Sequence, residues 1–226
     1  CLREDLNETA QRTMAVIRPV KLTITNYPEG QSETFQVENN PNDPAAGTRS
    51  VTFSRHLYVE EEDFMEQPIP KYKRLYPEGP ECRLKGAYLI TCTGCVKDES
   101  GRVVEILATY DPDSSGGNPA DGRKVKGATI HWVDASTAVD AQVRLYDNLF
   151  ADENPDGGDK DFLDCLNPGS LEVLEGCKLE ASLAGAQAPA QYQFLRLGYF
   201  CVDSKDSKPG HLVFNRSVSL KDSFKK

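Results

Sequence analysis

The sequence predicts an all-β fold made of β-barrels, with one short helix at the N-terminus. Short runs of alternating or β-branched apolar residues recur along the chain, and 14 prolines and 17 glycines separate them. Hardly any helical periodicity follows residue 12. Many short strands divided by turn residues are typical of β-barrels rather than of layered α/β folds.

The stretch 1–12 has a helical pattern, because Leu2 and Leu6 are spaced i, i+4 and Ala10 continues the same stripe. After this stretch the sequence pattern changes, and VKLTITNY (20–27) is an alternating run with β-branched residues. This run predicts the first long strand, ended by a Pro-Glu-Gly turn. We therefore expect a helical stub followed by β-structure.

The remainder of the chain alternates between predicted strands and turn-rich loops. The residues Glu99-Ser100-Gly101-Arg102 lie between two apolar runs and predict a hairpin. Loops are predicted at 38–50, 111–124 and 151–162, and an acidic helical turn at 60–65. Strands are predicted near 51–53, 56–59, 83–98, 103–111, 128–135, 141–147, 171–180, 192–203 and 212–220.

Composition restricts the class of protein. The chain has 226 residues, a formal net charge of -9, and no apolar run near the roughly twenty residues of a membrane span. Its seven cysteines are an odd number without the spacing of a small disulfide scaffold, which favours reduced thiols in the cytoplasm. The first residue is not Met and no signal peptide pattern follows it. We expect a piece of a longer cytoplasmic protein.

Two loops resemble ligand-binding motifs without completing them. DPDSSGG opens like a calcium loop, but Gly122 stands where an EF-hand requires Glu. GNPADGRK lacks the Gly-Lys-Ser/Thr ending of a phosphate loop and precedes a strand instead of a helix. Both loops are interpreted as turns.

The cysteines and histidines give no metal or catalytic pattern. Cys92 and Cys95 have the spacing of half a zinc site, but no second pair of ligands is found, so buried thiols near a strand end are favoured. His131 precedes Trp132 in a predicted strand and is interpreted as a packed core residue. No catalytic constellation and no metal site are identified, so the sequence predicts a binding protein rather than a catalytic one.

The basic stretch KYKRLYPEGPECRLK (71–85) is the strongest functional signal, because it places five cationic residues and two tyrosines in an acidic chain. One interpretation is a solvated loop that keeps a sheet edge soluble. The other is a site for single-stranded RNA, in which Arg pairs with guanine, Lys holds phosphate and Tyr stacks on a base. Two further basic runs favour the RNA site: KVKGATIHW brings Lys124 and Lys126, and QYQFLRLGYF brings Gln193 and Arg196 beside tyrosines.

Several segments together resemble the C-terminal region of bacterial glutaminyl-tRNA synthetases. They are RTMAVIRPVKLTITNYPEG, NNPNDPAAGTRSV, PADGRKVKGATIHWVDA, VRLYDNLF and FNRSVSLKDSF, in order and across almost the whole chain. The resemblance implies two ribosomal protein L25-like β-barrels that bind the anticodon loop of tRNA-Gln. It also implies that the class I catalytic domain, which uses ATP with Mg²⁺, lies upstream of this chain.

The resemblance also implies roles for individual residues. Arg74 would read the third anticodon base, a guanine. Arg12 and Gln193 would lie at the middle uracil. Arg83 and Lys85 would approach the first base, although the family pattern has arginine where this chain has Lys85. Lys73 and Arg196 would be supporting contacts, which completes the anticodon-binding set Arg12, Lys73, Arg74, Arg83, Lys85, Gln193 and Arg196.

The domain limits expected from the resemblance are a stub at 1–12, a proximal barrel from 13–58 with 126–226, and a distal barrel at 59–125. The expected protein is a monomer with no DNA or membrane partner. Two alternatives stay open. One is the related eukaryotic and archaeal type of glutamyl-tRNA synthetase, and the other is a β-barrel that docks proteins rather than RNA.

Overall fold

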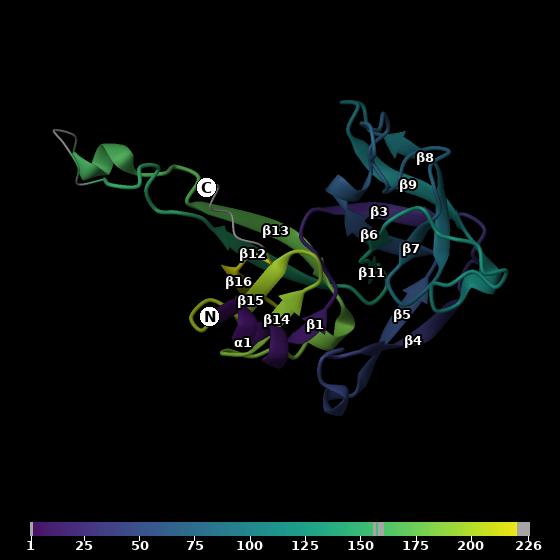
Figure 1. The fold of residues 1–226 in the computed structure, drawn as a ribbon, viewed down its shortest axis with the longest axis horizontal. Helices are drawn as coiled ribbons and strands as arrows, with labels where there is room; N and C mark the ends of the chain where they lie inside the picture. The colour runs from purple at the N-terminus through teal and green to yellow at the C-terminus, as the bar shows by residue number, and fades with distance from the viewer. Residues whose placement is uncertain (1, 156, 158–160, 221–226) are drawn as a thin grey trace.

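The computed structural model describes residues 2–155, 157 and 161–220, and β-strands dominate it (Figure 1). Helix α1 (Leu2–Thr9) opens the chain and buries Leu6 against Ala10 and Tyr199. Its carboxyl end meets β1, and the rest of the described chain is strands, turns and single-turn 3-10 helices. Among the described residues, no helix is long and apolar enough to cross a membrane.

The first seven-stranded sheet unites the start of the chain with its last third. Its strand order is β1-β14-β15-β16-β12-β13-β2. The outermost strands β1 and β2 are separated in the chain by Met14 alone, so the sheet curls until its two edges meet at one segment. Closure of this kind removes free sheet edges. The strands are β1 (Gln11–Thr13), β2 (Ala15–Val16), β12 (Val139–Tyr146), β13 (Leu171–Leu179), β14 (Gln191–Phe194), β15 (Gly198–Val202) and β16 (Leu212–Val218).

The second seven-stranded sheet contains the middle of the chain and closes in the same way. Its order is β10-β7-β8-β9-β3-β6-β11, and its outer strands β10 and β11 are separated by His131 and Trp132. Trp132 is buried and donates from Nε1 to the carbonyl of Lys85 at 3.0 Å. The strands are β3 (Pro19–Ile24), β6 (His56–Glu60), β7 (Cys82–Leu84), β8 (Leu89–Lys97), β9 (Val103–Tyr110), β10 (Thr129–Ile130) and β11 (Val133–Asp134).

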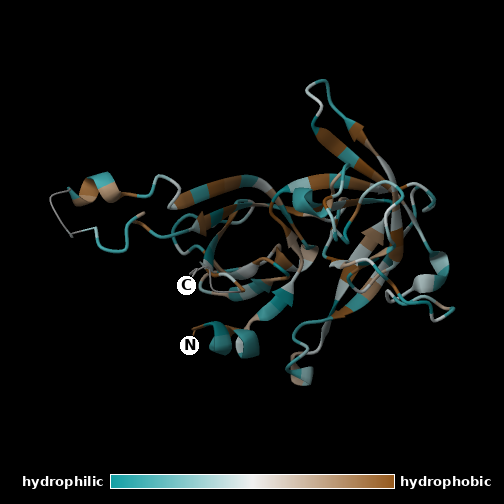
Figure 2. Cartoon of the chain, turned by 45° about the horizontal axis from the view of Figure 1, so that its top comes forward, coloured by the Kyte–Doolittle hydropathy of each residue, from teal (hydrophilic) through white to brown (hydrophobic). Residues whose placement is uncertain are grey.

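Each sheet surrounds its own hydrophobic core. The core of the second sheet includes Phe53 and Trp132, whose rings meet edge to face with centroids 5.3 Å apart. The core of the first sheet includes Phe194 and Phe200, which stack at 4.3 Å. Figure 2 shows hydrophobic residues along the strands and hydrophilic residues on α1 and in many of the connecting loops. Burial of these side chains is the main source of stability for both bodies.

The hairpin of β4 (Ser32–Glu38) and β5 (Thr48–Ser54) forms a separate two-stranded sheet that reaches across to α1 and β1 (Figure 1). At its tip, the Asn40 side chain donates to the carbonyl of Glu8 at 2.6 Å. The backbone N–H of Arg12 donates to the carbonyl of Asn39 at 2.7 Å. The bond from Asn40 satisfies a carbonyl near the end of α1, and the bond from Arg12 joins β1 to the hairpin. The hairpin thus connects the second sheet, whose core contains Phe53 of β5, to α1 and to β1 of the first sheet.

Two buried glutamates fix the segment that joins the sheets. Glu60 accepts the backbone N–H groups of Ile17 at 2.8 Å and Arg18 at 3.0 Å, and Glu180 accepts that of Met14 at 2.8 Å. Burial alone raises the pKa of Glu60, but hydrogen bonding from His131 and from these backbone groups outweighs it and lowers the pKa. The linker is therefore held by charged acceptors in the interior.

The all-β prediction is confirmed, and so are most of the predicted strands. The predicted helix ends earlier than expected, at Thr9, because residues 11–12 pair with β14 as strand β1. Strand β4 was not predicted, and β5 begins at Thr48, so the loop predicted at 38–50 is shorter. The strand predicted at 83–98 is divided by a turn between β7 and β8.

The single strand predicted at 192–203 is wrong, because the chain forms a hairpin of β14 and β15 there. The N–H of Leu197 donates to the carbonyl of Phe194 at 3.0 Å, and Arg196 has φ +69° in the turn between them. A bulky residue with positive φ is uncommon, so the sequence LRLG gave no turn signal.

The predicted domain limits stay a prediction, although the sheets divide the chain at other positions. Strand β3, which lies in the predicted proximal segment 13–58, pairs with β9 of the predicted distal segment, and β6 crosses the predicted limit at residue 58. Residues 156 and 158–160 of the loop predicted at 151–162 lie outside the described residues.

Candidate nucleic-acid interface

The basic stretch 71–85 contains strand β7 of the second sheet and is held against that sheet by backbone hydrogen bonds. Its backbone joins β10 and the residue before it, through the bonds from Lys85 N to Ile130 O at 2.9 Å and from Ala128 N to Lys73 O at 2.7 Å. Leu75, Cys82 and Leu84 are buried beneath it. The cationic side chains are consequently directed outward or only partly covered.

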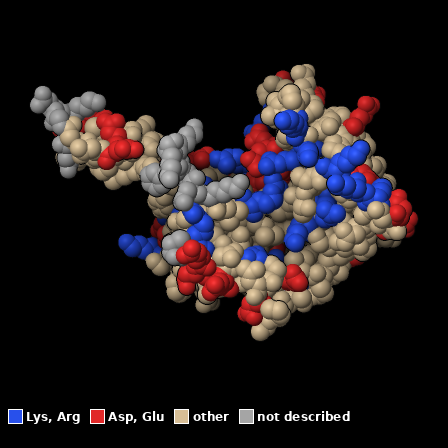
Figure 3. Space-filling model, viewed as in Figure 1, with Lys and Arg blue, Asp and Glu red and all other residues tan. Residues whose placement is uncertain are grey.

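Lys and Arg side chains gather across the middle of the face seen in Figure 3, over the region between the two sheets. Acidic side chains lie beside this band and toward the rim of the molecule. The net charge of -9 thus coexists with a local basic surface, because screening confines each surface field to roughly 10 Å. An acidic chain can therefore offer a polyanion one selective site.

Arg12 and Gln193 lie side by side although 181 positions separate them. Strands β1 and β14 pair in parallel with Arg12 opposite Gln193, and Arg12 Nε donates to Gln193 Oε1 at 2.7 Å. Arg12 also donates from Nη2 to Asn7 Oδ1 at 3.0 Å. The bond to Arg12 occupies the Gln193 oxygen and leaves the Gln193 amide nitrogen to donate elsewhere, so the pair can present hydrogen-bond donors to a ligand.

A pocket of about 270 Å³ opens beside this pair and brings both sheets and the β4–β5 hairpin together. Lys85 contributes a cation from the second sheet, and three apolar side chains form part of the wall. Concave sites with apolar walls and a few polar groups are typical of small-ligand and base-binding sites. The lining residues are Arg12, Val37, Glu38, Pro41, Lys85, Gln193 and Leu195.

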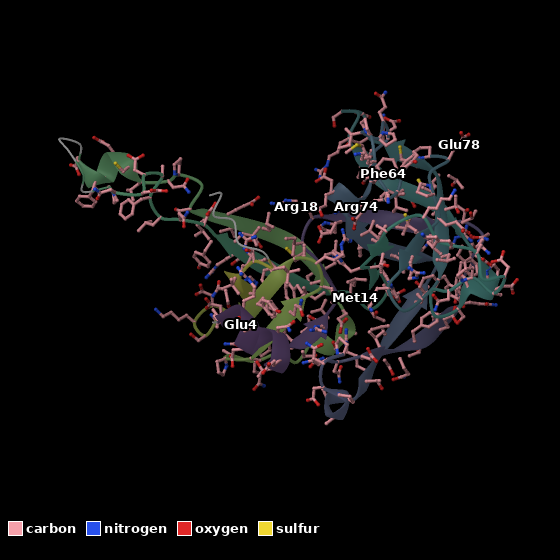
Figure 4. The ribbon with its side chains drawn as sticks, in the orientation of Figure 1. Glu4, Met14, Arg18, Phe64, Arg74 and Glu78 are labelled. Atoms are coloured by element: carbon pink, nitrogen blue, oxygen red, sulfur yellow. The ribbon has the colours of Figure 1, made fainter. Side chains whose placement is uncertain are left out.

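Arg74 and Arg196 meet at one carboxylate, that of Asp63. Arg196 donates from Nη2 to Asp63 Oδ1 at 2.6 Å and from Nη1 to Oδ2 at 2.8 Å, while Arg74 Nη1 lies 3.3 Å from Oδ1. Arg74 Nη1 also lies 3.1 Å from Glu62 Oε1. In Figure 4, Arg74 lies below Phe64, on the side of the second sheet that faces the first. The sequence predicted an acidic turn here but not its contact with the basic residues.

Arg83 rests on the loop between β9 and β10. Its Nε donates to the carbonyl of Gly117, where φ is +85° and an added Cβ would approach the Arg83 side chain to 2.9 Å. Arg123 fixes this loop through ion pairs with Glu81 and Asp111, both at 2.6 Å. Neither Gly117 nor Arg123 was singled out from the sequence, because their role depends on which strand lies beneath the loop.

Tyr72 extends the same surface. Its ring lies near that of Tyr76, with centroids 6.3 Å apart, and its hydroxyl donates to the carbonyl of Glu62 at 3.0 Å. Burial raises the pKa of Tyr72 to about 12, so the hydroxyl stays a donor at neutral pH. Lys71, Lys73, Lys124 and Lys126 are exposed around it.

Six of the seven predicted site residues fall into three groups, and the seventh, Lys73, is next to Arg74 in the chain. Arg12, Lys85 and Gln193 share the pocket, and Arg74 and Arg196 share Asp63. Arg83 contacts the loop at Gly117. Lys73 stays exposed beside them and anchors the segment only through its backbone.

The interpretation of His131 as a core residue is confirmed by its exposed fraction of 1%, but its surroundings are polar. Its Nε2 lies 3.4 Å from Glu60 Oε1, and its Nδ1 lies 3.4 Å from Arg196 Nη1. Cys92 is buried as expected, and burial raises its pKa to about 11, whereas Cys95 is only partly buried. Among the described residues, no cluster of three or more His, Cys, Asp or Glu side chains is placed to hold a metal ion.

Replacing both Cys92 and Cys95 with serine should leave RNA affinity within about twofold, because neither thiol lies among the predicted contacts. The free energy of unfolding should fall by about 1 kcal/mol, since a hydroxyl replaces the buried Cys92 thiol. Filter binding and urea unfolding measure the two effects. Stoichiometric zinc in the purified protein by elemental analysis would contradict this interpretation.

Comparison with known proteins gives one consistent result. Two family models match, both described as tRNA synthetases class I (E and Q), anti-codon binding domain, over residues 10–111 and 129–203. Relatives named glutamine–tRNA ligase match almost the whole of this chain. The one from Clostridium kluyveri is 53% identical over 99% of this chain and 40% of its own length. Those from Bradyrhizobium diazoefficiens and Bordetella pertussis are 52% and 54% identical, over 100% and 99% of this chain and 40% and 38% of their own lengths.

Proposed function

Because the chain belongs to the family of class I tRNA synthetase (E and Q) anticodon-binding domains, we propose that it is the anticodon-binding region of a glutaminyl-tRNA synthetase. Such an enzyme attaches glutamine to tRNA-Gln with the use of ATP. The chain spans about 40% of the length of the relatives it matches. The region proposed here recognises the anticodon loop, and the reaction occurs elsewhere in the enzyme.

The observation that carries this proposal is the meeting of Arg12, Lys85 and Gln193 in one pocket. Unstacked anticodon bases need separate sites with hydrogen-bonding groups, and a single-stranded RNA needs cations along its backbone. Strand β14 in the first sheet and the segment 73–85 beside the second sheet together supply the hydrogen-bonding groups and the cations. No arrangement of this kind is required of a barrel that only docks proteins.

Residues from these groups are assigned to the three anticodon positions, with Lys85 placed together with Arg83. Arg74 reads the guanine at the third position, and Arg12 with Gln193 contacts the middle uracil. The Gln193 amide can serve a uracil edge, which presents both donors and acceptors. Arg83 and Lys85 approach the first base.

Lys73 and Arg196 have supporting roles of different kinds. Lys73 is exposed and contacts phosphate, whereas both terminal nitrogens of Arg196 already donate to Asp63. Arg196 therefore supports the site from beneath rather than through a direct bond to RNA.

ATP and Mg²⁺ belong to the full reaction, but the residues that the structure describes do not fit them. The sequence has no Gly-Lys-Ser/Thr phosphate loop, and the described residues provide no metal-ligand cluster. Isolated chain should give no glutamine-dependent ATP–pyrophosphate exchange above background, and measurable exchange would contradict this assignment.

Electrophoretic mobility shift with tRNA-Gln and tRNA-Glu tests the proposal. We expect a tighter complex with tRNA-Gln, formed by one protein chain, and no comparable affinity for a DNA copy of the loop. Equal or tighter binding of tRNA-Glu would favour the glutamyl enzyme. Absence of binding to either tRNA would favour a protein-docking module. The identity of 52–54% to glutamine–tRNA ligases supports the first outcome.

Affinity for an anticodon stem-loop should fall with salt. If about four phosphates are neutralised, a plot of log K against log salt has a slope near -3, with roughly -0.7 for each single-strand contact. Lys126→Gln should reduce the slope by about 0.7, because Lys126 is exposed beside the site. Lys178→Gln is the matched control, since Lys178 lies on β13 and pairs with Asp140. A flat salt response would exclude the lysines as phosphate contacts.

A further inference from the structure

Asp63 is a fully buried carboxylate that lies against two cationic side chains, Arg74 and Arg196. Its side chain is 0% exposed, and it ends the single 3-10 turn Glu61–Asp63. The Asp63 carbonyl also accepts the N–H of Leu75 at 2.9 Å, which holds the segment bearing Arg74 alongside the turn. A buried charge is tolerated only when it is paired and hydrogen-bonded, so the arginines around Asp63 are a condition of its presence.

Arg196 reaches Asp63 from the other sheet. The two residues are 133 positions apart, and their bidentate pair joins the β14–β15 turn to the second sheet. Arg196 holds a φ of +69°, a conformation that glycine would adopt at lower cost. Burial alone lowers the pKa of Arg196, but the bonds to Asp63 outweigh it and raise the pKa. Arg196 thus places its guanidinium against Asp63 from a turn position that glycine would occupy at lower cost.

Arg74 makes its protein contacts through one nitrogen. Nη1 faces Glu62 O at 3.2 Å, Glu62 Oε1 at 3.1 Å and Asp63 Oδ1 at 3.3 Å. Within the described part of the chain, Nε and Nη2 of Arg74 have no hydrogen-bond partner. These two nitrogens form the edge of a guanidinium that can donate two parallel bonds to O6 and N7 of guanine. The protein therefore occupies one side of the guanidinium and leaves the reading side available.

We propose that Asp63 is the positioning residue for guanine recognition by Arg74: fixed by Arg196, its carboxylate holds Arg74 Nη1 so that the Nε–Nη2 edge faces the base. This inference rests on the proposed function of Arg74. Glu62 is a weaker guide, because 66% of its side chain is exposed and exposed ion pairs hold geometry poorly. Orientation before binding spares the entropy that a free arginine loses when it docks.

The test compares affinities for two anticodon stem-loops, with guanine or adenine at the third anticodon position, at fixed salt. Asp63→Asn preserves side-chain size and removes the charge. We expect the guanine-to-adenine preference to fall at least fivefold. The ratio is the informative quantity, because partial unfolding weakens both loops equally and cancels from it. Glu61→Gln is the matched control, with the same loss of charge in the same turn on an exposed residue.

A double variant separates positioning from direct contact. In the Arg74→Ala background, Asp63→Asn should cause no further loss of preference, since Asp63 acts only through Arg74. If Asp63→Asn does not fold, Asp63→Glu gives the same measurement, because it keeps the charge but moves the carboxylate by one methylene. We expect that variant to lose preference as well.

The outcomes distinguish the two proposals. If wild type prefers guanine, Arg74→Ala loses the preference and the folded Asp63 variant keeps it, then Asp63 only joins the sheets and the inference is overturned. If wild type shows no guanine preference, or Arg74→Ala retains it, the role of Arg74 is wrong and the inference fails with it. A fall in preference with Asp63→Asn but not Glu61→Gln supports the inference.

Discussion

Replacement of Glu60 with alanine should lower the free energy of unfolding by about 3–5 kcal/mol. Glu60 is 2% exposed, and its two oxygens accept the N–H groups of Ile17 and Arg18 in the segment that joins the sheets. Alanine leaves both groups without their acceptor in the interior and removes the charge that faces His131. Urea unfolding followed by circular dichroism measures the change. Glu61→Ala is the control, since Glu61 is exposed and should change stability by less than about 0.5 kcal/mol.

The same residue predicts a dependence on pH. The pKa of Glu60 is lowered from its ordinary value of 4.5, so its charged form stabilises the folded protein above about pH 4.5. This contribution is lost as the pH falls below that value, through the pKa of the folded state. The stability of wild type should therefore fall more steeply in this range than that of Glu60→Ala. Parallel pH profiles for the two proteins, with equal stability at pH 7, would show that Glu60 does not hold the linker.

Replacement of Arg74 with alanine should reduce the preference for guanine at the third anticodon position by about 5- to 150-fold, which corresponds to roughly 1–3 kcal/mol. Guanine accepts two bonds at O6 and N7, whereas adenine presents an amino donor in place of O6. Without the guanidinium, no donor contacts O6 and N7 of guanine, so the site no longer distinguishes guanine from adenine. The side chain is 33% exposed and held at Nη1, so it is partly ordered before RNA arrives.

Lys73→Ala is the matched control, because the two residues are adjacent and lose the same charge. Lys73 is exposed and offers a point charge without a planar fork, so its loss should weaken both stem-loops about equally. Affinities for the guanine and adenine loops are measured at one salt concentration for both variants. An equal loss for both loops in Arg74→Ala would assign Arg74 a purely electrostatic role.

Local sequence determined the strands and the basic surface of this protein. The alternating run at 20–27 predicted β3, and Glu99-Ser100-Gly101-Arg102 predicted the β8–β9 hairpin, because strand periodicity and turn chemistry act between near neighbours. Within 71–85, only Arg83 and Lys85 follow strand alternation, because they alternate with the buried Cys82 and Leu84. Predictions failed where tertiary contacts override local preference, as at Arg196, whose positive φ no neighbouring residue signals.

Only the tertiary structure decided how those residues meet. Arg12 contacts Gln193 because β1 pairs with β14 across 181 positions, and Arg196 reaches Asp63 across 133. Each sheet closes through a short segment, so strands distant in sequence become neighbours whose register sets which side chains share a pocket. Propensity and periodicity describe the faces of one strand but not its partner. The basic residues were therefore readable from the sequence, whereas the buried acids beneath them appear only when the two sheets are packed together.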